Sequence, residues 1–169
     1  MNINDWEKKF SDWSSPPSDS EQDRIDNSVA AVRKAIANHN ALNDKNIEVF
    51  VQGSYKNNVN VKKDSDVDIA VLSKKTFIFD SVNEEVKNHV NSNHSPATYD
   101  YNTFKNDVQK ALENHFGESS VKRGNKAFNI RENTYRVDAD VVPFFEYRWY
   151  TDINQSSNGV ALYTDDASK

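Results

Sequence analysis

The pair Asp66-x-Asp68 is the feature that most constrains this chain, because it opens an apolar run. Alternate side chains of a strand point to opposite faces, so Asp66 and Asp68 point the same way. Val67 and Ile69 would then anchor the opposite face in a core. We therefore predict a buried strand over residues 67–72 with two carboxylates at its start.

These carboxylates suggest a metal site. Two adjacent carboxylates repel each other, and a bound cation relieves that repulsion. Proteins usually hold Mg²⁺ through one or two carboxylates plus substrate phosphates, and a third carboxylate would complete a site for two ions, with Mn²⁺ as a substitute. A second acidic segment contains Asp138 and Asp140, which share a face. The alternative is that Asp66 and Asp68 are solvated charges at a strand edge.

A small-residue turn, Gln52-Gly53-Ser54, is separated from Asp66 by eleven residues. Glycine permits close backbone approach, and backbone N–H groups with a serine hydroxyl suit phosphate oxygens. We predict that Gly53 and Ser54 hold the phosphates of a nucleoside triphosphate. In the alternative, Ser54 is only a turn residue. Gln52 either orients the turn or contacts the nucleotide.

The order of these motifs resembles the polymerase β-type nucleotidyltransferase superfamily. Residues 51–55 (VQGSY) and 140–143 (DVVP) are similar to bacterial relatives of oligoadenylate synthase and cyclic GMP-AMP synthase. Those enzymes make cyclic oligonucleotide signals in anti-phage defence. Over residues 18–150, the resemblance implies an α+β fold, a polymerase β-like mixed sheet with long helices packed on one face. It places the third metal ligand at Asp140 and leaves Asp138 as a supporting group or a solvent-facing acid.

The resemblance implies an enzyme that moves a nucleotidyl group from a nucleoside triphosphate to a ribose hydroxyl. Asp66, Asp68 and Asp140 would be catalytic and metal-binding, and Gln52, Gly53 and Ser54 would bind nucleotide. Cyclic-nucleotide members carry a helical half after the catalytic sheet, and this chain stops at Lys169. We expect the catalytic lobe of a longer synthase, which would expose apolar surface and self-associate. The alternatives are a minimal nucleotidyltransferase acting on RNA or protein, and a nucleotide- or partner-binding module without turnover.

Composition excludes several other classes. The chain has 169 residues and a net charge of −5, which fits one domain and argues against generic DNA binding. It has no cysteine, so neither disulfides nor thiolate metal sites are available. No apolar run approaches the ~20 residues of a membrane span, and residues 1–10 lack a signal segment. We expect a cytoplasmic protein whose partners are nucleoside triphosphates.

Periodicity predicts the elements around these motifs. A first helix is expected around Trp6, Phe10 and Trp13, and a second from a Ser18 cap to about Asn40. A third is expected after a Ser81/Glu84 capping pair, with Val82, Val86 and Val90 as its apolar stripe. A fourth is expected from Tyr101 to Gly117. Strands are expected at 47–52, 67–72, 120–130, 134–142, 144–150 and, within a polar tail, 160–163. The predicted parts are a helix and linker (1–17), a catalytic domain (18–150), and a tail or the start of a further half (151–169).

Two groups of basic residues have open roles. Lys56, Lys62 and Lys63 lie between the turn and the acidic strand, and would either steer a triphosphate or balance nearby acids. Arg123, Lys126, Arg131 and Arg136 precede the third aspartate, where surface ion pairs are favoured over substrate contacts.

Overall fold

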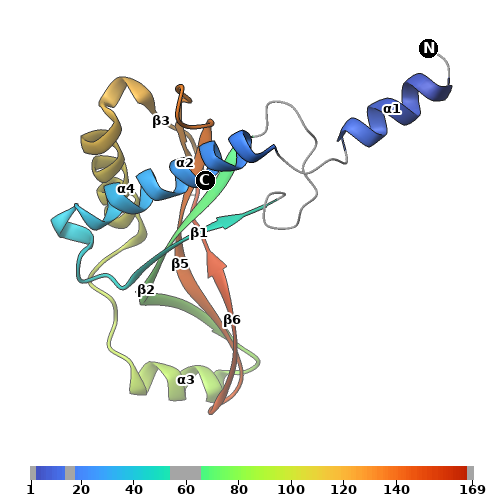
Figure 1. Ribbon diagram of the computed structural model, residues 1–169. Coiled ribbons are helices and arrows are strands. Elements are labelled where there is room, and N and C mark those ends of the chain that lie inside the picture. Colours follow the sequence, from blue (N-terminus) through green and yellow to red (C-terminus); the bar gives the residue numbers. More distant parts are fainter. Residues whose placement is uncertain (1–2, 14–17, 54–65, 167–169) are drawn as a thin grey trace.

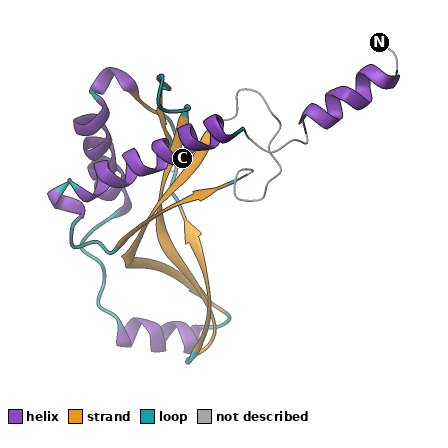
Figure 2. Ribbon diagram, viewed as in Figure 1, coloured by secondary structure: helices purple, strands orange, loops and turns teal. Residues whose placement is uncertain are grey.

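Helices and a mixed sheet make up the protein, whose computed structural model describes residues 3–13, 18–53 and 66–166. The helices are α1 (Ile3–Trp13), α2 (Asp19–Ala37), η1 (Asn40–Leu42), α3 (Glu84–Asn93), α4 (Tyr101–Phe116) and η2 (Glu118–Ser120). The strands are β1 (Ile47–Gln52), β2 (Val67–Ser81), β3 (Val121–Arg123), β4 (Phe128–Ile130), β5 (Ala139–Asp152) and β6 (Gln155–Ala161). The arrangement in Figures 1 and 2 confirms the predicted α+β class.

The sheet is built around two central parallel strands, β2 and β5. Its order is β1-β2-β5-β4-β3, and β6 also pairs with β5. Strand β5 pairs with β4 over residues 139–141 and with β6 over residues 145–152. Pro143 lies between these two stretches, so its missing N–H breaks neither antiparallel ladder. Its carbonyl accepts a hydrogen bond from the Tyr101 hydroxyl at 2.8 Å.

The main core lies on one face of the sheet, where α2 and α4 pack. Its buried side chains include Ile25, Val29, Val32 and Ile36 of α2, Phe104, Val108 and Leu112 of α4, and Val67, Ile69 and Val71 of β2. The expected apolar stripe of α2 is therefore confirmed, as is the anchoring of β2 through Val67 and Ile69. Ala70, Leu72, Val142 and Phe144 form a smaller cluster. Because strand residues alternate, these four share a face with Asp68 and Asp140, opposite α2 and α4.

Strand β2 is longer than predicted, reaching Ser81 instead of Leu72. A register shift between Ser73 and Phe77 interrupts the ladder with β5. Polar residues there interrupt the hydrophobic alternation, so the sequence pattern does not predict the second half of β2. Their backbone nevertheless pairs, since the N–H of Lys74 donates to the Asn46 carbonyl at 3.1 Å.

Two predicted helix boundaries are wrong. The N-cap of α3 is Asn83, whose side chain accepts from the Val86 N–H at 2.9 Å, so Ser81 does not cap it. Val82 consequently lies before the helix and is exposed, outside the buried stripe of Val86 and Val90. Helix α2 has the predicted Ser18 cap but ends at Ala37.

The β-rich segments also differ from their predicted bounds. Residues 120–130 hold two short strands, β3 and β4, joined across a turn at Gly124. The predicted strands at 134–142 and 144–150 are one strand, β5, which begins only at Ala139. The polar segment 155–161 forms β6, where only a short strand at 160–163 was expected. The division of the chain at residues 17 and 150 stays a prediction.

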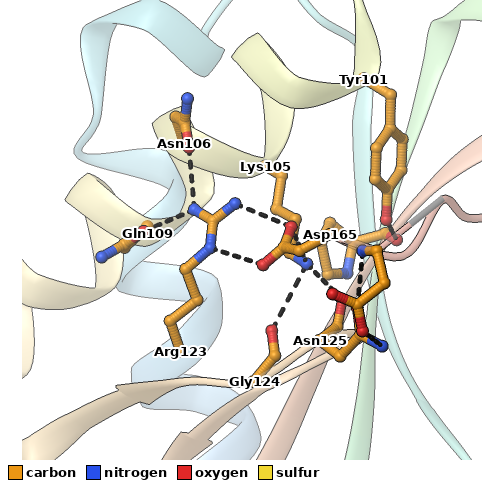
Figure 3. A network of polar contacts seen from close by, with 10 residues as sticks. Tyr101, Lys105, Asn106, Gln109, Arg123, Gly124, Asn125 and Asp165 are labelled. Carbon is orange, nitrogen blue, oxygen red and sulfur yellow. Dashed lines mark hydrogen bonds and ion pairs between the residues drawn. The ribbon is translucent and has the colours of Figure 1, made fainter. Parts of the chain in front are cut away.

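The buried Lys105 of α4 forms an ion pair with Asp165, in the segment after β6 (Figure 3). The Lys105 side chain is fully buried on α4, and its Nζ lies 2.8 Å from Oδ1 of Asp165 and 2.6 Å from the Asn125 carbonyl. Arg123 also binds Asp165, at 2.9 Å, so this arginine serves an ion pair, as favoured from the sequence. The two cations hold the pKa of Asp165 down at about 2, through hydrogen bonds from Arg123 first and Lys105 next.

Candidate active site

The predicted aspartates meet in a row across the sheet. In the parallel ladder, Asp68 of β2 lies directly opposite Asp140 of β5. In the antiparallel ladder on the other side, Gln52 at the end of β1 lies opposite Asp68. Neighbouring strands are about 4.8 Å apart and opposed residues face the same side. Register therefore brings Gln52, Asp68 and Asp140 together, and Asp66 lies just before β2 begins.

The backbone of Gly53 lies against the Asp68 carboxylate. It has a φ of 75°, the left-handed region that glycine adopts freely. A Cβ built on Gly53 would overlap Oδ2 of Asp68 and lie 3.2 Å from its Cγ. The turn therefore needs glycine both for its backbone angle and for room beside the carboxylate. Its neighbour Ser54 lies outside the described residues, as do Lys56, Lys62 and Lys63.

Burial and neighbouring negative charges disfavour the ionised forms of Asp66 and Asp68. Burial raises the pKa of Asp68, and the charge of Asp140 raises it further. Burial likewise raises the pKa of Asp66, followed by the charges of Asp140, Asp138, Asp68 and Glu132. Each of these shifts means that the ionised form is disfavoured in the folded protein. A cation among these groups would relieve the repulsion.

Asp138, whose role the sequence left open, supports the turn that leads into β5. Its Oδ1 accepts a hydrogen bond from the Glu132 N–H at 2.6 Å. Its main-chain carbonyl accepts from the Val67 N–H at 3.0 Å, which joins the starts of β2 and β5. Asp138 therefore positions the entry to β5, and its charge acts on Asp66.

Helix α2 braces the same turn with two polar side chains that sequence reasoning missed. Nη2 of Arg24 donates to the Arg136 carbonyl at 2.8 Å and to the Glu132 carboxylate at 2.8 Å. The buried Ser28 donates to the Val137 carbonyl and accepts from the Val137 N–H, at 3.1 and 3.2 Å. These bonds link α2 to the segment that places Asp140. The Arg136 guanidinium itself lies 4.5 Å from the centre of the Phe116 ring.

Asn129 is a further site residue that sequence reasoning missed. It lies on β4 opposite Asp140, and its Nδ2 donates to Oδ1 of Asp140 at 3.2 Å. This bond fixes one oxygen of Asp140 and leaves the other available. No motif marks Asn129, because the contact depends on the pairing of two strands.

The donor chemistry of the site fits hard divalent ions. Asp66, Asp68 and Asp140 offer carboxylate oxygens, which Mg²⁺ and Mn²⁺ prefer. Across the described residues, no three acidic or histidine side chains converge as a ready-made metal cluster. Asp68 and Asp140 lie opposite each other near the starts of β2 and β5, and Asp66 lies just before β2.

The chain matches a known protein family. The family model described as the second messenger oligonucleotide or dinucleotide synthetase domain matches residues 1–160. The chain belongs to this family. The predicted resemblance to bacterial cyclic-oligonucleotide synthases is thereby confirmed.

Curated relatives and a solved structure agree with this assignment. The chain is 42% identical over 159 residues to a cyclic dipyrimidine nucleotide synthase of Cecembia lonarensis, covering 94% of this chain and 53% of the relative. It is 42% identical over 153 residues to a synthase of the same description from Legionella pneumophila, covering 90% and 52%. The c-UMP-AMP synthase of Rhodothermus marinus, solved with Apcpp and Upnpp, superposes with a TM-score of 0.78 at 30% identity, covering 94% and 52%.

The chain spans about half the length of the curated relatives it matches. The shared half contains the sheet, α2 and α4, and the row of aspartates. Among the helices that the structure describes, none is both long and apolar enough to cross a bilayer.

Proposed function

We propose that this protein is a metal-dependent nucleotidyltransferase that moves a nucleoside monophosphate from a triphosphate to a ribose hydroxyl. The observation that carries the proposal is the opposition of Asp68 and Asp140 on the two parallel strands, beside the Gly53 turn. Three carboxylates next to a close-approach glycine, two of them with a raised pKa, suit a triphosphate and its cations. Curated relatives named as cyclic nucleotide synthases support a cyclic oligonucleotide product, which we place in anti-phage signalling in the cytoplasm.

Each side chain has a role in this reaction. Asp66, Asp68 and Asp140 would hold two Mg²⁺ ions, with Mn²⁺ as a substitute. When bound, such ions neutralise phosphate charge and make a hydroxyl a better nucleophile. The backbone of Gly53 and the hydroxyl of Ser54 would hold the β- and γ-phosphates, and Gln52 would orient the turn. Asn129 would keep Asp140 aimed at its ion. Positioning and charge neutralisation then supply the rate enhancement.

Nucleoside triphosphates are the proposed substrates. The Rhodothermus marinus relative was solved with Apcpp and Upnpp, an adenine and a uracil nucleotide analogue by their names. The two curated relatives above are described as dipyrimidine synthases, which points to uridine and cytidine triphosphates as the first pair to test.

The test is a product assay. The protein is incubated with each labelled nucleoside triphosphate, and with all four, in Mg²⁺ and separately in Mn²⁺. We expect a phosphatase-resistant product from the wild type and none from Asp68→Asn. Asp138→Asn is the matched control, because asparagine can still accept the Glu132 hydrogen bond, and it should retain product formation.

The outcomes separate the competing functions. Equal product from wild type and Asp68→Asn would refute the metal-site assignment. Metal-dependent triphosphate binding without pyrophosphate release would favour the nucleotide-binding module. Product that forms only when an RNA or protein acceptor is added would favour the minimal nucleotidyltransferase.

A further inference from the structure

A cavity lies far from the aspartates, beside residues 75–79 of β2. Its volume is about 700 Å³, and its walls include Lys45, Lys75, Phe77, Phe79, His94 and Tyr99. Lys75 follows Asp68 by seven residues on the same strand, so at ~3.3 Å per residue the cavity lies about 20 Å from the carboxylate row. Its walls come from the turn before β1, the middle of β2, and the end of α3 with the loop that follows. Cavities of roughly 300–1,000 Å³ accommodate small organic ligands.

The cavity carries an excess of positive charge. Lys75 Nζ lies 2.6 Å from one carboxylate oxygen of Asp44, and Lys45 Nζ lies 2.7 Å from the other. Asp44 is the only acid among the described lining residues, so two ammonium groups share one carboxylate. Lys45 is held further by the Tyr99 ring, whose centre is 4.4 Å from its Nζ. Among the lining residues, one positive charge is therefore left for an anion to neutralise, while the nearby Asp107 carboxylate accepts a hydrogen bond from the Tyr99 hydroxyl at 2.7 Å.

The same cavity has aromatic walls. Phe77 and Phe79 have ring centres 6.3 Å apart, and the His94 ring meets Phe77 edge-on at 5.0 Å. Nδ1 of His94 lies 3.0 Å from the Val90 carbonyl, which can only accept, so Nδ1 is the donor and Nε2 remains for a ligand. The Arg148 guanidinium lies over the Phe77 ring, 3.9 Å from its centre, so a planar ligand ring would meet the edge or the other face of Phe77, together with Phe79.

We propose that this cavity binds a planar aromatic phosphate ester, with its phosphate on Lys45 and Lys75 and its ring against Phe77 and Phe79. Lysines serve as point charges for phosphate, and here two of them are held in place by Asp44. A nucleoside monophosphate likewise combines a phosphate ester with a planar aromatic ring, joined through its ribose. The site is independent of the nucleotidyltransferase assignment, because none of its lining residues belongs to the carboxylate row.

The first experiment uses 1-naphthyl phosphate as the probe, in EDTA so that the aspartates hold no metal. Binding to the full chain is followed by amide chemical shifts in NMR. We expect saturable shifts at Lys75, Phe77 and Tyr99. Inorganic phosphate and 1-naphthol, which each carry half of the probe, should bind at least about tenfold more weakly. Equal binding of inorganic phosphate and naphthyl phosphate, or shifts confined to Gly53 and Asp68, would overturn the proposal.

Two neighbouring lysines supply a matched pair of variants. Lys74 and Lys75 are adjacent on β2 and each pairs with an acid, Glu48 and Asp44 respectively. Both are largely exposed, but only Lys75 lines this cavity. Lys75→Met should weaken naphthyl phosphate binding about tenfold, because one charge-assisted contact is lost, whereas Lys74→Met should leave it unchanged. Equal losses in both variants would contradict the assignment, and urea unfolding of each confirms that it folds.

Discussion

Replacing Gly53 with alanine tests the link between the turn and the metal site. The new Cβ would overlap Oδ2 of Asp68, and the carboxylate is the part that can move away. Rotating that carboxylate should cost little free energy of unfolding, but it would move the Asp68 oxygen away from the proposed metal ion. We therefore expect Gly53→Ala to harm metal binding far more than folding.

The backbone angles and contacts of Gly53 set the expected losses of folding stability and of metal affinity. Alanine at a φ of 75° costs about 1–2 kcal/mol relative to glycine. Gly117, at the end of α4, offers the matched control, since its φ is 84° and nothing lies within 4 Å of a Cβ built on it. Gly117→Ala should lose at least as much free energy of unfolding, because a φ of 84° with a ψ of 142° is almost restricted to glycine, and it makes no contact with Asp68. Misorienting a ligand typically weakens metal affinity about 10–100-fold, and only Gly53→Ala should show that loss.

The assay measures Mn²⁺ binding by electron paramagnetic resonance, beside urea unfolding of both variants. Lowered unfolding free energies in both variants, with a loss of Mn²⁺ affinity in Gly53→Ala alone, would support the reasoning. Equal Mn²⁺ affinities in Gly53→Ala and Gly117→Ala would refute it, because the steric contact with Asp68 would then have no consequence for the site.

Three further substitutions have defined outcomes. Asp165→Asn should lower the unfolding free energy by about 1–2 kcal/mol at pH 7: a pKa lowered from 3.8 to about 2 corresponds to roughly 2.4 kcal/mol before discounting for solvent screening. Since a lowered pKa stabilises above the unfolded value, this difference should shrink as pH falls from about 4 to 2 in urea titrations. Asn129→Ala should weaken Mn²⁺ binding about tenfold in the same resonance assay, with Asp140 left unrestrained. Asp68→Asn should raise the metal-free unfolding free energy at pH 7, because a raised carboxyl pKa means that ionisation opposes folding.

Much of the site could be predicted because it depends on short-range periodicity. Asp66 and Asp68 sit beside apolar strand residues, and a period of two predicts which face they take. Periodicity does not separate Asp140 from Asp138, and the choice of Asp140 came from the family resemblance. Close backbone approach at Gly53 could be predicted from local chemistry, but its contact with the Asp68 carboxylate depends on the pairing of β1 with β2. The structure adds the register, which sets Asp68 opposite Asp140.

The rest depends on contacts between distant segments. Asn129 acts on Asp140 only because β4 pairs with β5, and no local pattern marks it. Strand β6 has a polar sequence and is held by its backbone ladder with β5, so hydrophobic alternation does not reveal it. Lys105 would be expected on the exposed side of a helix, but Asp165, sixty residues later, compensates its charge in the interior.

The most direct test of the central claim counts Mn²⁺ ions bound per chain in the presence of a non-hydrolysable uridine triphosphate analogue. The account predicts two ions for the wild type, and loss of tight binding in both Asp68→Asn and Asp140→Asn while each variant remains folded. Unchanged Mn²⁺ stoichiometry and affinity in either variant would contradict the claim that these opposed aspartates form the metal site.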